Sequence, residues 1–327
     1  MLNNPMDVLK QFPVRKTKAQ KAAFRSAVQS YAGKLNYPVT VEKGSFGACN
    51  LLLGDPETAK FLVTAHYDTC ARMLLPNFIT PCNVPVYLTY QLGLILMIIV
   101  GAIALSVAES VALAGIAVLL GNHLGDAWIL FVGLVAPSLF GFSGLLLVLM
   151  LVIGPANKNN ANDNTSGVVT LLEIARTLPE NQRHKVCFVL FDLEEAGLIG
   201  SASYRRKHKK ASSDQLVLNL DCVGDGDHLL MIPSKKLRND RKKLTSLYKA
   251  CGYFGNKSFL VHEKGAAVYP SDQKHFPYSV GICALNARKK LLYMSRIHTK
   301  RDTVLEETNV NILRAALTTF ICRDEVN

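Results

Sequence analysis

The stretch Val-Cys-Phe-Val-Leu-Phe-Asp-Leu-Glu-Glu, residues 186–195, passes abruptly from apolar residues to two adjacent carboxylates. Residues 186–191 show no polar alternation, which is typical of a parallel strand buried on both faces. Glu194 and Glu195 follow its carboxyl end, and ligands bind at that edge of open α/β sheets. Because neighbouring carboxylates repel one another, a bound cation is their simplest partner. Taken alone, the two glutamates are better explained as solvated side chains at the start of a helix, so the rest of the sequence has to decide whether they bind a metal.

The same pattern, an apolar strand that ends in polar residues, occurs twice more. Residues 61–65 precede His66 and Asp68, and residues 215–220 precede Asp221. Two residues apart in an extended segment, His66 and Asp68 point the same way, and metal-binding imidazoles favour a carboxylate beside them. Either motif alone is also consistent with a structural role.

A polar loop, residues 157–167, precedes an apolar-periodic segment that predicts a helix over residues 168–178. Asx and Thr residues are good N-caps, so the helix is expected to begin near Thr165 with Asp163 just outside it. Capping and metal binding are both open roles for Asp163. Another amphipathic helix is predicted over residues 15–35, with a basic face that is solvated or touches anionic lipid.

Two long apolar runs separate His66 from the later candidates. Residues 73–108 and 127–157 contain no charged side chain, and each run exceeds the roughly 20 residues needed to cross a bilayer. We predict two transmembrane helices, at about 86–108 and 128–153, with a polar turn or short interfacial helix over residues 109–126. An even number of crossings returns the chain to the side that it left, as one shared site requires.

The formal net charge of +12 is distributed unevenly along the chain. No Lys or Arg lies between Arg72 and Lys158, so the positive-inside rule predicts a cell-membrane protein with two spans and its bulk in the cytoplasm. The basic residues lack aromatic interleaving, which argues against nucleic-acid binding. Eight cysteines without a C-x-x-C pair argue against disulfide scaffolds and zinc fingers. The first residues lack a basic and then apolar pattern, so no secretory signal peptide is expected.

Together the polar motifs resemble the co-catalytic zinc exopeptidases, the family of double-zinc aminopeptidases, glutamate carboxypeptidase and glutaminyl cyclase. The matching segments are His66-Tyr-Asp68, Ala161-Asn-Asp163-Asn-Thr-Ser-Gly167, Glu194-Glu195-x-Gly197-Leu-x-Gly200-Ser201, Asn219-Leu-Asp221 and His298-Thr-x-x-Asp302. They occur in the family's order and span the chain outside the apolar runs. Ser271-Asp272 resembles a further motif, but Gln273 stands where the family has His and His275 is displaced. Neither Asp272 nor His275 is therefore given a role.

This resemblance implies a mixed β-sheet sandwiched between helices, formed by residues 1–83 and 155–327 and interrupted by the transmembrane hairpin, residues 84–154. It implies a metal centre of two zinc ions and a cis peptide bond after the bridging aspartate. The implied roles are Asp163 as the bridge, His66 and Asp221 on one zinc, Glu195 and His298 on the other, Glu194 as general base, and Asp68 and Asp302 as orienting residues.

The function that follows is a membrane-anchored zinc-dependent exopeptidase, and an aminopeptidase in particular. A two-metal-activated water would hydrolyse the N-terminal peptide bond of a peptide substrate, with Glu194 as the base. The alternatives are a catalytically inactive binding or assembly protein of the same fold, or a glutaminyl cyclase-like acyltransferase, which generally uses one zinc. The hairpin at residues 86–153 either only anchors the protein in the lipid bilayer or also lies near the substrate entrance.

Overall fold

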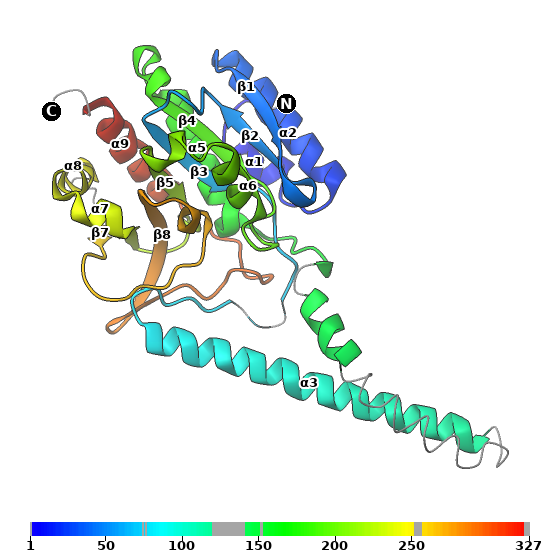
Figure 1. Cartoon of the computed structure of the whole chain (residues 1–327). Helices are drawn as coiled ribbons and strands as arrows, with labels where there is room; N and C mark the ends of the chain where they lie inside the picture. Colours follow the sequence, from blue (N-terminus) through cyan, green and yellow to red (C-terminus); the bar gives the residue numbers. More distant parts are fainter. Residues whose placement is uncertain are drawn as a thin grey trace. The chain divides into compact units, whose positions relative to one another are not determined.

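The computed structural model describes residues 2–73, 75, 77–119, 141–150, 153–251 and 257–323 (Figure 1). The chain divides into two compact units. Unit 1 comprises Met1–Val84 and Ala156–Asn327, and unit 2 comprises Pro85–Pro155. Unit 1 carries the α/β fold and every candidate site residue, whereas unit 2 carries the apolar insertion.

Unit 1 is built on a mixed sheet with the strand order β1-β2-β4-β3-β5-β8-β6-β7, and β9 pairs with β8. The central neighbours β4, β3, β5 and β8 are parallel, while β2 and β6 join them antiparallel. The strands are β1 (Val39–Lys43), β2 (Cys49–Leu53), β3 (Phe61–His66), β4 (Val186–Phe191), β5 (Leu216–Leu220), β6 (His228–Pro233), β7 (Ser258–Val261), β8 (Ser279–Arg288) and β9 (Leu291–Tyr293). The predicted mixed sheet is thus confirmed.

Helices flank this sheet, as the sequence predicted. They are α1 (Asp7–Gln11), α2 (Lys18–Lys34), α5 (Gly167–Thr177), α6 (Ile199–Lys207), α7 (Lys235–Asn239), α8 (Arg241–Cys251) and α9 (Glu307–Arg323). The start of α2 is fixed by a capping box, in which the Thr17 hydroxyl accepts from the Gln20 N–H and the Gln20 side chain accepts from the Thr17 N–H. Helix α2 therefore begins three residues later than the predicted helix over residues 15–35.

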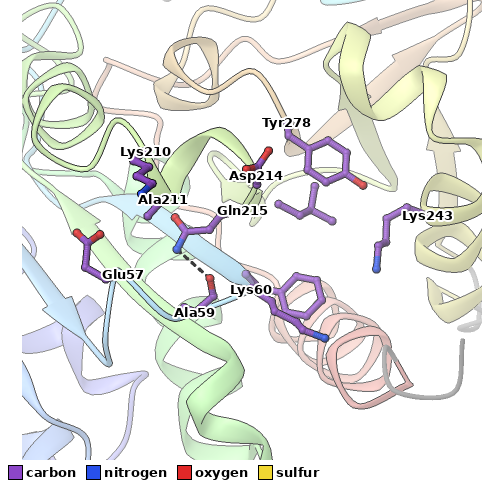
Figure 2. Close-up of a pocket in the computed structure, with 11 residues that line it drawn as sticks. Glu57, Ala59, Lys60, Lys210, Ala211, Asp214, Gln215, Lys243 and Tyr278 are labelled. Carbon is purple, nitrogen blue, oxygen red and sulfur yellow. Dashed lines mark hydrogen bonds between the residues drawn. The ribbon is translucent and has the colours of Figure 1, made fainter.

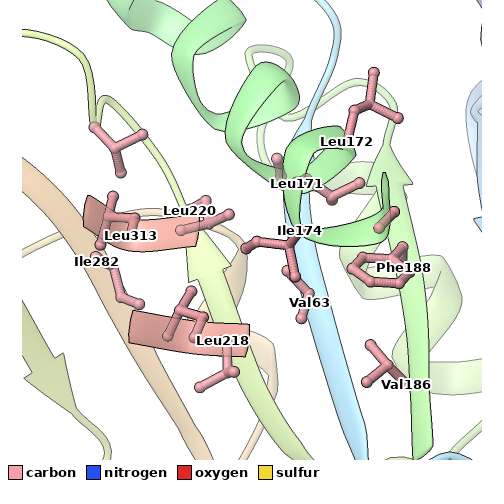
Figure 3. Close-up of a cluster of buried hydrophobic side chains, with 14 of the residues drawn as sticks. Val63, Leu171, Leu172, Ile174, Val186, Phe188, Leu218, Leu220, Ile282 and Leu313 are labelled. Atoms are coloured by element: carbon pink, nitrogen blue, oxygen red, sulfur yellow. The ribbon is translucent and has the colours of Figure 1, made fainter. Parts of the chain in front are cut away.

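Both faces of the central strands are buried. On one face, Val63 of β3 and Phe188 of β4 belong to a large apolar cluster with Ile174 of α5 (Figure 3). On the other face, Val189 belongs to a second cluster with Tyr204 of α6. Burial on both faces is the reason that these strands are continuous apolar runs in the sequence.

In unit 2, α3 (Val84–Leu119) is a single long apolar helix. Its segment Val84–Ile116 is long and apolar enough to cross a membrane, since at 1.5 Å per residue it extends about 50 Å against a hydrocarbon core of about 30 Å. The helix continues through Glu109, where the sequence predicted that the first span would end. The predicted turn over residues 109–126 is therefore helical up to residue 119.

A second apolar helix in unit 2, Gly141–Met150, contacts α3. The Ser143 hydroxyl donates a hydrogen bond of 3.1 Å to Glu109 Oε2. Gly144 faces Ala102, because a Cβ at Gly144 would lie 3.8 Å from the Ala102 Cβ. Of the predicted second span, residues 128–140 and 151–152 lie outside the described residues.

Candidate metal centre

The carboxyl ends of three neighbouring parallel strands bring the first candidate residues to one edge of the sheet. His66 is the last residue of β3, Glu194 and Glu195 follow β4, and Asp221 follows β5 directly. Parallel strands end at the same edge, so residues that are far apart in the sequence meet there.

Asp163 lies at the centre of this group. It belongs to an irregular helical turn, η3 (Ala161–Ser166), and its peptide bond to Asn164 is cis, as the resemblance implied. Its Oδ1 lies 3.2 Å from His66 Nε2, and its Oδ2 lies 3.0 Å from His298 Nε2. The two carboxylate oxygens of one aspartate thus face two different histidines.

Each histidine also faces a second carboxylate. His66 Nε2 lies 3.5 Å from Asp221 Oδ1, and His298 Nε2 lies 3.3 Å from Glu195 Oε2. The structure therefore places all five predicted ligands together, as two histidine–carboxylate pairs on either side of Asp163. Glu194 belongs to neither pair, but its carboxylate lies within 4.8 Å of ligand atoms of His66 and Asp221.

Asp68 contacts the backbone of the acidic pair. Its Oδ1 accepts from the Glu194 N–H at 3.1 Å, and its Oδ2 accepts from the Glu195 N–H at 3.2 Å. The same Oδ1 lies 3.6 Å from His66 Nδ1, which is too long for a hydrogen bond. The main-chain oxygen of Asp68 lies closer to that nitrogen, at 3.2 Å. The carboxylate of Asp68 therefore fixes the turn of Glu194 and Glu195 more directly than it fixes His66.

Arg15 is a contributor that the sequence analysis missed. It was assigned to the basic face of the predicted helix over residues 15–35, yet its side chain is fully buried. Its Nε donates to the Tyr67 main-chain oxygen at 2.5 Å and one terminal nitrogen donates to Thr165 Oγ1 at 3.2 Å. Burial lowers the pKa of Arg15 to about 10, against the charges of Asp68 and Asp163, which raise it. This guanidinium ties the end of β3 to η3.

Two asparagines of the polar loop hold the segment after β5. Asn162 Oδ1 accepts from the main-chain N–H groups of Gly224 at 2.7 Å and Asp225 at 3.1 Å, while Asn164 Nδ2 donates to the Leu220 main-chain oxygen at 2.9 Å. The sequence marked this loop as a source of N-caps. Asn164 Oδ1 does accept from the N–H of Gly167, the first residue of α5, at 3.0 Å. The other contacts reach backbone about 60 residues away in sequence, and local pattern gave no signal for them.

The buried carboxylates of the centre favour the binding of a cation. Burial raises the pKa of Glu194 well above its ordinary value and that of Glu195 to about 8. Glu195 Oε1 and Asp221 Oδ1 are buried without a hydrogen-bond partner among the described residues, an arrangement that costs free energy unless an ion binds. Carboxylate oxygens and imidazole nitrogens are donors that zinc accepts, so these residues fit zinc.

Asp272 and His275 both lie in a short helical turn, η6 (Asp272–His275). Asp272 is fully buried, and burial raises its pKa to about 7. The charge of Asp272 also raises the pKa of Glu194, the candidate base. His275 has a buried Nε2 without a partner among the described residues. Neither residue faces Asp163 in the pairs described above.

A separate cavity of about 740 Å³ lies away from these residues (Figure 2). Phe61 and Leu216, the first residues of β3 and β5, line it. The candidate metal ligands follow the opposite ends of the same strands. Lys60, Lys210 and Lys243 also line the cavity, but no candidate site residue does. This cavity is therefore distinct from the metal centre.

Comparison with known proteins agrees with this arrangement. The model of the family described as peptidase family M28 matches residues 150–320, more than half of the chain. Aminopeptidase YwaD of Bacillus subtilis is 40% identical over 67 residues, which are 20% of this chain and 15% of the length of that protein.

Solved structures share the fold at low identity. A glutaminyl cyclase of Porphyromonas gingivalis is 16% identical with a TM-score of 0.59, over 98% of this chain and 96% of that one. The aminopeptidase LapA of Legionella pneumophila is 13% identical with a TM-score of 0.55, over 98% and 70%. A Zn-dependent exopeptidase of Parabacteroides distasonis is 17% identical with a TM-score of 0.53, over 97% and 94%. The zinc-exopeptidase-like fold is thus confirmed.

Proposed function

Because the chain belongs to peptidase family M28, we propose that it is a zinc-dependent aminopeptidase anchored in a membrane by unit 2. The sequence prediction of a metallo-exopeptidase is confirmed at the level of the family. Cleavage at amino ends, the use of two metal ions and the anchoring are the proposed parts. The observation that carries the proposal is that the two oxygens of Asp163 face separate histidine–carboxylate pairs.

This arrangement supports a pair of ions rather than one. A carboxylate bridge suits two ions about 3.5 to 4 Å apart, and each oxygen of Asp163 would bind one of them. His66 and Asp221 would complete one site, and Glu195 and His298 the other. Zinc bound there would polarise the scissile carbonyl group and lower the pKa of a bound water towards neutral pH.

Glu194 is the proposed general base. It lies beside His66 and Asp221 without facing Asp163, so its carboxylate is available for proton transfer. Burial raises its pKa, and the charges of Glu195 and Asp272 raise it further, whereas His66 lowers it. Glu194 takes a proton from the attacking water and delivers it to the amine that leaves as the C–N bond breaks.

The charge of the site favours a substrate with a free amino terminus. Seven carboxylates surround the centre, and two zinc ions together with Arg15 would offset five of these charges, so the remaining negative charge attracts an ammonium group and repels a terminal carboxylate. The local similarity to an aminopeptidase supports the same end. The acidic side chains concerned are Asp68, Asp163, Glu194, Glu195, Asp221, Asp272 and Asp302, and the cationic side chain is that of Arg15, since His66 and His298 are neutral when they bind zinc.

Two features of unit 2 support a membrane anchor with two spans. Helix α3 exposes apolar side chains along its length, including Leu92, Ile99 and Val107. The second helix, Gly141–Met150, is also apolar, and its contacts with α3 favour a hairpin. The absence of Lys and Arg between Arg72 and Lys158 favours unit 1 on the cytoplasmic side.

The test is hydrolysis of a peptide panel by the purified full chain in detergent. The panel holds peptides with free and blocked amino termini and one with an N-terminal glutamine, and metal content is measured in parallel. We expect turnover of free amino termini with about two zinc ions per chain. Glu194→Gln should lower kcat about 100-fold or more with zinc retained, whereas the exposed Glu180→Gln should not.

Other outcomes separate the alternatives. Cyclisation of the glutaminyl peptide without hydrolysis would establish an acyltransferase of the glutaminyl cyclase type. Bound zinc without any turnover, or no zinc at all, would contradict the aminopeptidase proposal and favour a binding or assembly protein.

A further inference from the structure

We propose that Cys70 supplies a thiolate ligand to the zinc site of Glu195 and His298. The inference deepens the proposed function, because it rests on the metal centre described above. It would make the two zinc sites chemically unequal, with sulfur on one ion only.

The position of the thiol is the first argument. Cys70 lies four residues after the end of β3, and ligand atoms of Cys70, Glu195 and His298 all lie within 4.8 Å of one another. The Cys70 residue is only 2% exposed, so its sulfur faces the interior of the protein. Glu195 Oε1 is buried and lacks a hydrogen-bond partner among the described residues. A cation among these three side chains would satisfy this oxygen and the sulfur together.

The backbone around Cys70 is anchored to the loop that carries Asp163. Its main-chain oxygen accepts from the Asn157 N–H at 3.1 Å, and its Sγ lies 3.6 Å from Asn160 Oδ1. Asn160 immediately precedes η3. Without a metal, the Cys70 thiol donates a weak hydrogen bond to Asn160 Oδ1. This hydrogen bond is lost when the thiol loses its proton and binds zinc.

The donor count agrees with zinc chemistry. Asp163, Glu195 and His298 offer three ligand atoms to this site. Cys70 would be the fourth, and the attacking water would then bind as a fifth ligand, a coordination number that catalytic zinc reaches. A thiolate is a soft ligand that favours zinc over manganese or magnesium, for which oxygen ligands are better suited. Because the metal binds the thiolate, the thiol proton is released to solvent as the site fills. Cys70 would thereby select the metal as well as hold it.

X-ray absorption spectroscopy of the zinc-loaded full chain in detergent tests this assignment directly. We expect a sulfur shell at about 2.3 Å beside the oxygen and nitrogen shell at about 2.0–2.2 Å. Cys70→Ser should remove the sulfur shell and weaken the binding of one zinc about 10-fold or more. Cys251→Ser is the matched control, since Cys251 is equally buried but lies in α8, and it should keep the shell.

Several outcomes would overturn the assignment. A wild-type spectrum with oxygen and nitrogen alone would do so, even if Cys70→Ser failed to fold. Loss of the shell in Cys222→Ser but not in Cys70→Ser would transfer the role to Cys222, whose sulfur lies within 4.8 Å of ligand atoms of Asp163 and Asp221. Peptide hydrolysis without a sulfur shell would overturn only the role of Cys70. A sulfur shell without hydrolysis would instead contradict the aminopeptidase proposal.

Discussion

The carboxylate of Asp302 accepts hydrogen bonds from two consecutive main-chain N–H groups of η3, those of Asn162 at 2.7 Å and Asp163 at 3.0 Å. Asp163 is the residue whose two oxygens face His66 and His298. Asp302 therefore holds the backbone that carries the Asp163 carboxylate, the proposed bridge, although it lies 139 residues away in sequence. Metal-ligand geometry commonly depends on such outer contacts.

Removal of the Asp302 carboxylate should weaken metal binding. In Asp302→Ala the two N–H groups lose their acceptor and Asp163 is no longer aimed, so we expect zinc affinity to fall about 10- to 100-fold. Competition with a chromophoric chelator measures this change. Asp214→Ala is the control, because Asp214 is exposed and pairs with Lys236 at the surface. Equal zinc affinity in both variants would contradict the role of Asp302.

Zinc should stabilise unit 1 against unfolding. Glu195 Oε1 and Asp221 Oδ1 are buried and have no hydrogen-bond partner among the described residues, so a bound cation should lower the free energy of the folded state. We expect chelator treatment to lower the unfolding temperature, and zinc at 100 times its Kd to restore about 2.7 kcal/mol for each site that it fills. Differential scanning fluorimetry in detergent measures the shift. An unfolding temperature that is independent of zinc would show that the acidic cluster does not bind it in the folded state.

A buried ion pair next to the centre should be essential for stability. Lys21 Nζ lies 2.7 Å from Asp192 Oδ1, and the two side chains are 8% and 1% exposed. Lys21→Met leaves the carboxylate buried without its cation, which typically costs about 3–5 kcal/mol. Addition of Asp192→Asn removes the charge and should recover part of the loss. Urea denaturation of the wild type, Lys21→Met and the double variant measures these changes in stability. A double variant less stable than Lys21→Met would contradict the role of the ion pair.

The sequence was sufficient to predict the site residues that come directly at or after the end of a buried strand. His66, Glu195 and Asp221 could be placed at one edge because β3, β4 and β5 are apolar on both faces and therefore identifiable as parallel strands. The geometry of their surroundings was not predictable in the same way. Arg15 binds main-chain oxygen of Tyr67, 52 residues away, and Asp68 binds N–H groups more than 120 residues away. Backbone partners leave no residue pattern, so only the folded chain shows these contacts.

Asp240 should make the stability of unit 1 depend on pH. It caps α8 by accepting from the Lys243 N–H at 2.9 Å, and its other oxygen accepts from the Tyr278 hydroxyl at 2.6 Å. The hydrogen bond from Tyr278 is the main reason that the pKa of Asp240 is lowered in the folded state. A lowered pKa gives stability that is present above the unfolded pKa, about 3.9, and is lost as the pH falls towards the folded pKa.

Asp240→Ala should therefore cost about 0.5–2 kcal/mol at pH 7, with a smaller difference from the wild type near pH 3. Asp240→Asn keeps a capping oxygen without the charge, so its loss at pH 7 should be smaller, and it should shrink as the pH falls because only the wild type loses the charge of Asp240. Urea denaturation across the pH range measures both variants. A cost of Asp240→Ala that grew as the pH fell below about 4 would contradict the assigned direction.

The apolar surface of α3 should hold the full chain in a membrane against alkaline extraction. Ile99 and Ile103 are 42% and 48% exposed in the middle of the long apolar segment, and an aspartate at the centre of a span costs about 2.5–3.5 kcal/mol. We expect the wild type to stay in the membrane pellet after carbonate treatment and Ile99→Asp/Ile103→Asp to be released. Phe46→Asp, at an exposed position of unit 1, should behave as the wild type does. A helix that spans the bilayer is held there by its buried apolar area, which alkaline carbonate does not weaken. Release of the wild-type chain by carbonate would therefore mean that α3 does not span the bilayer.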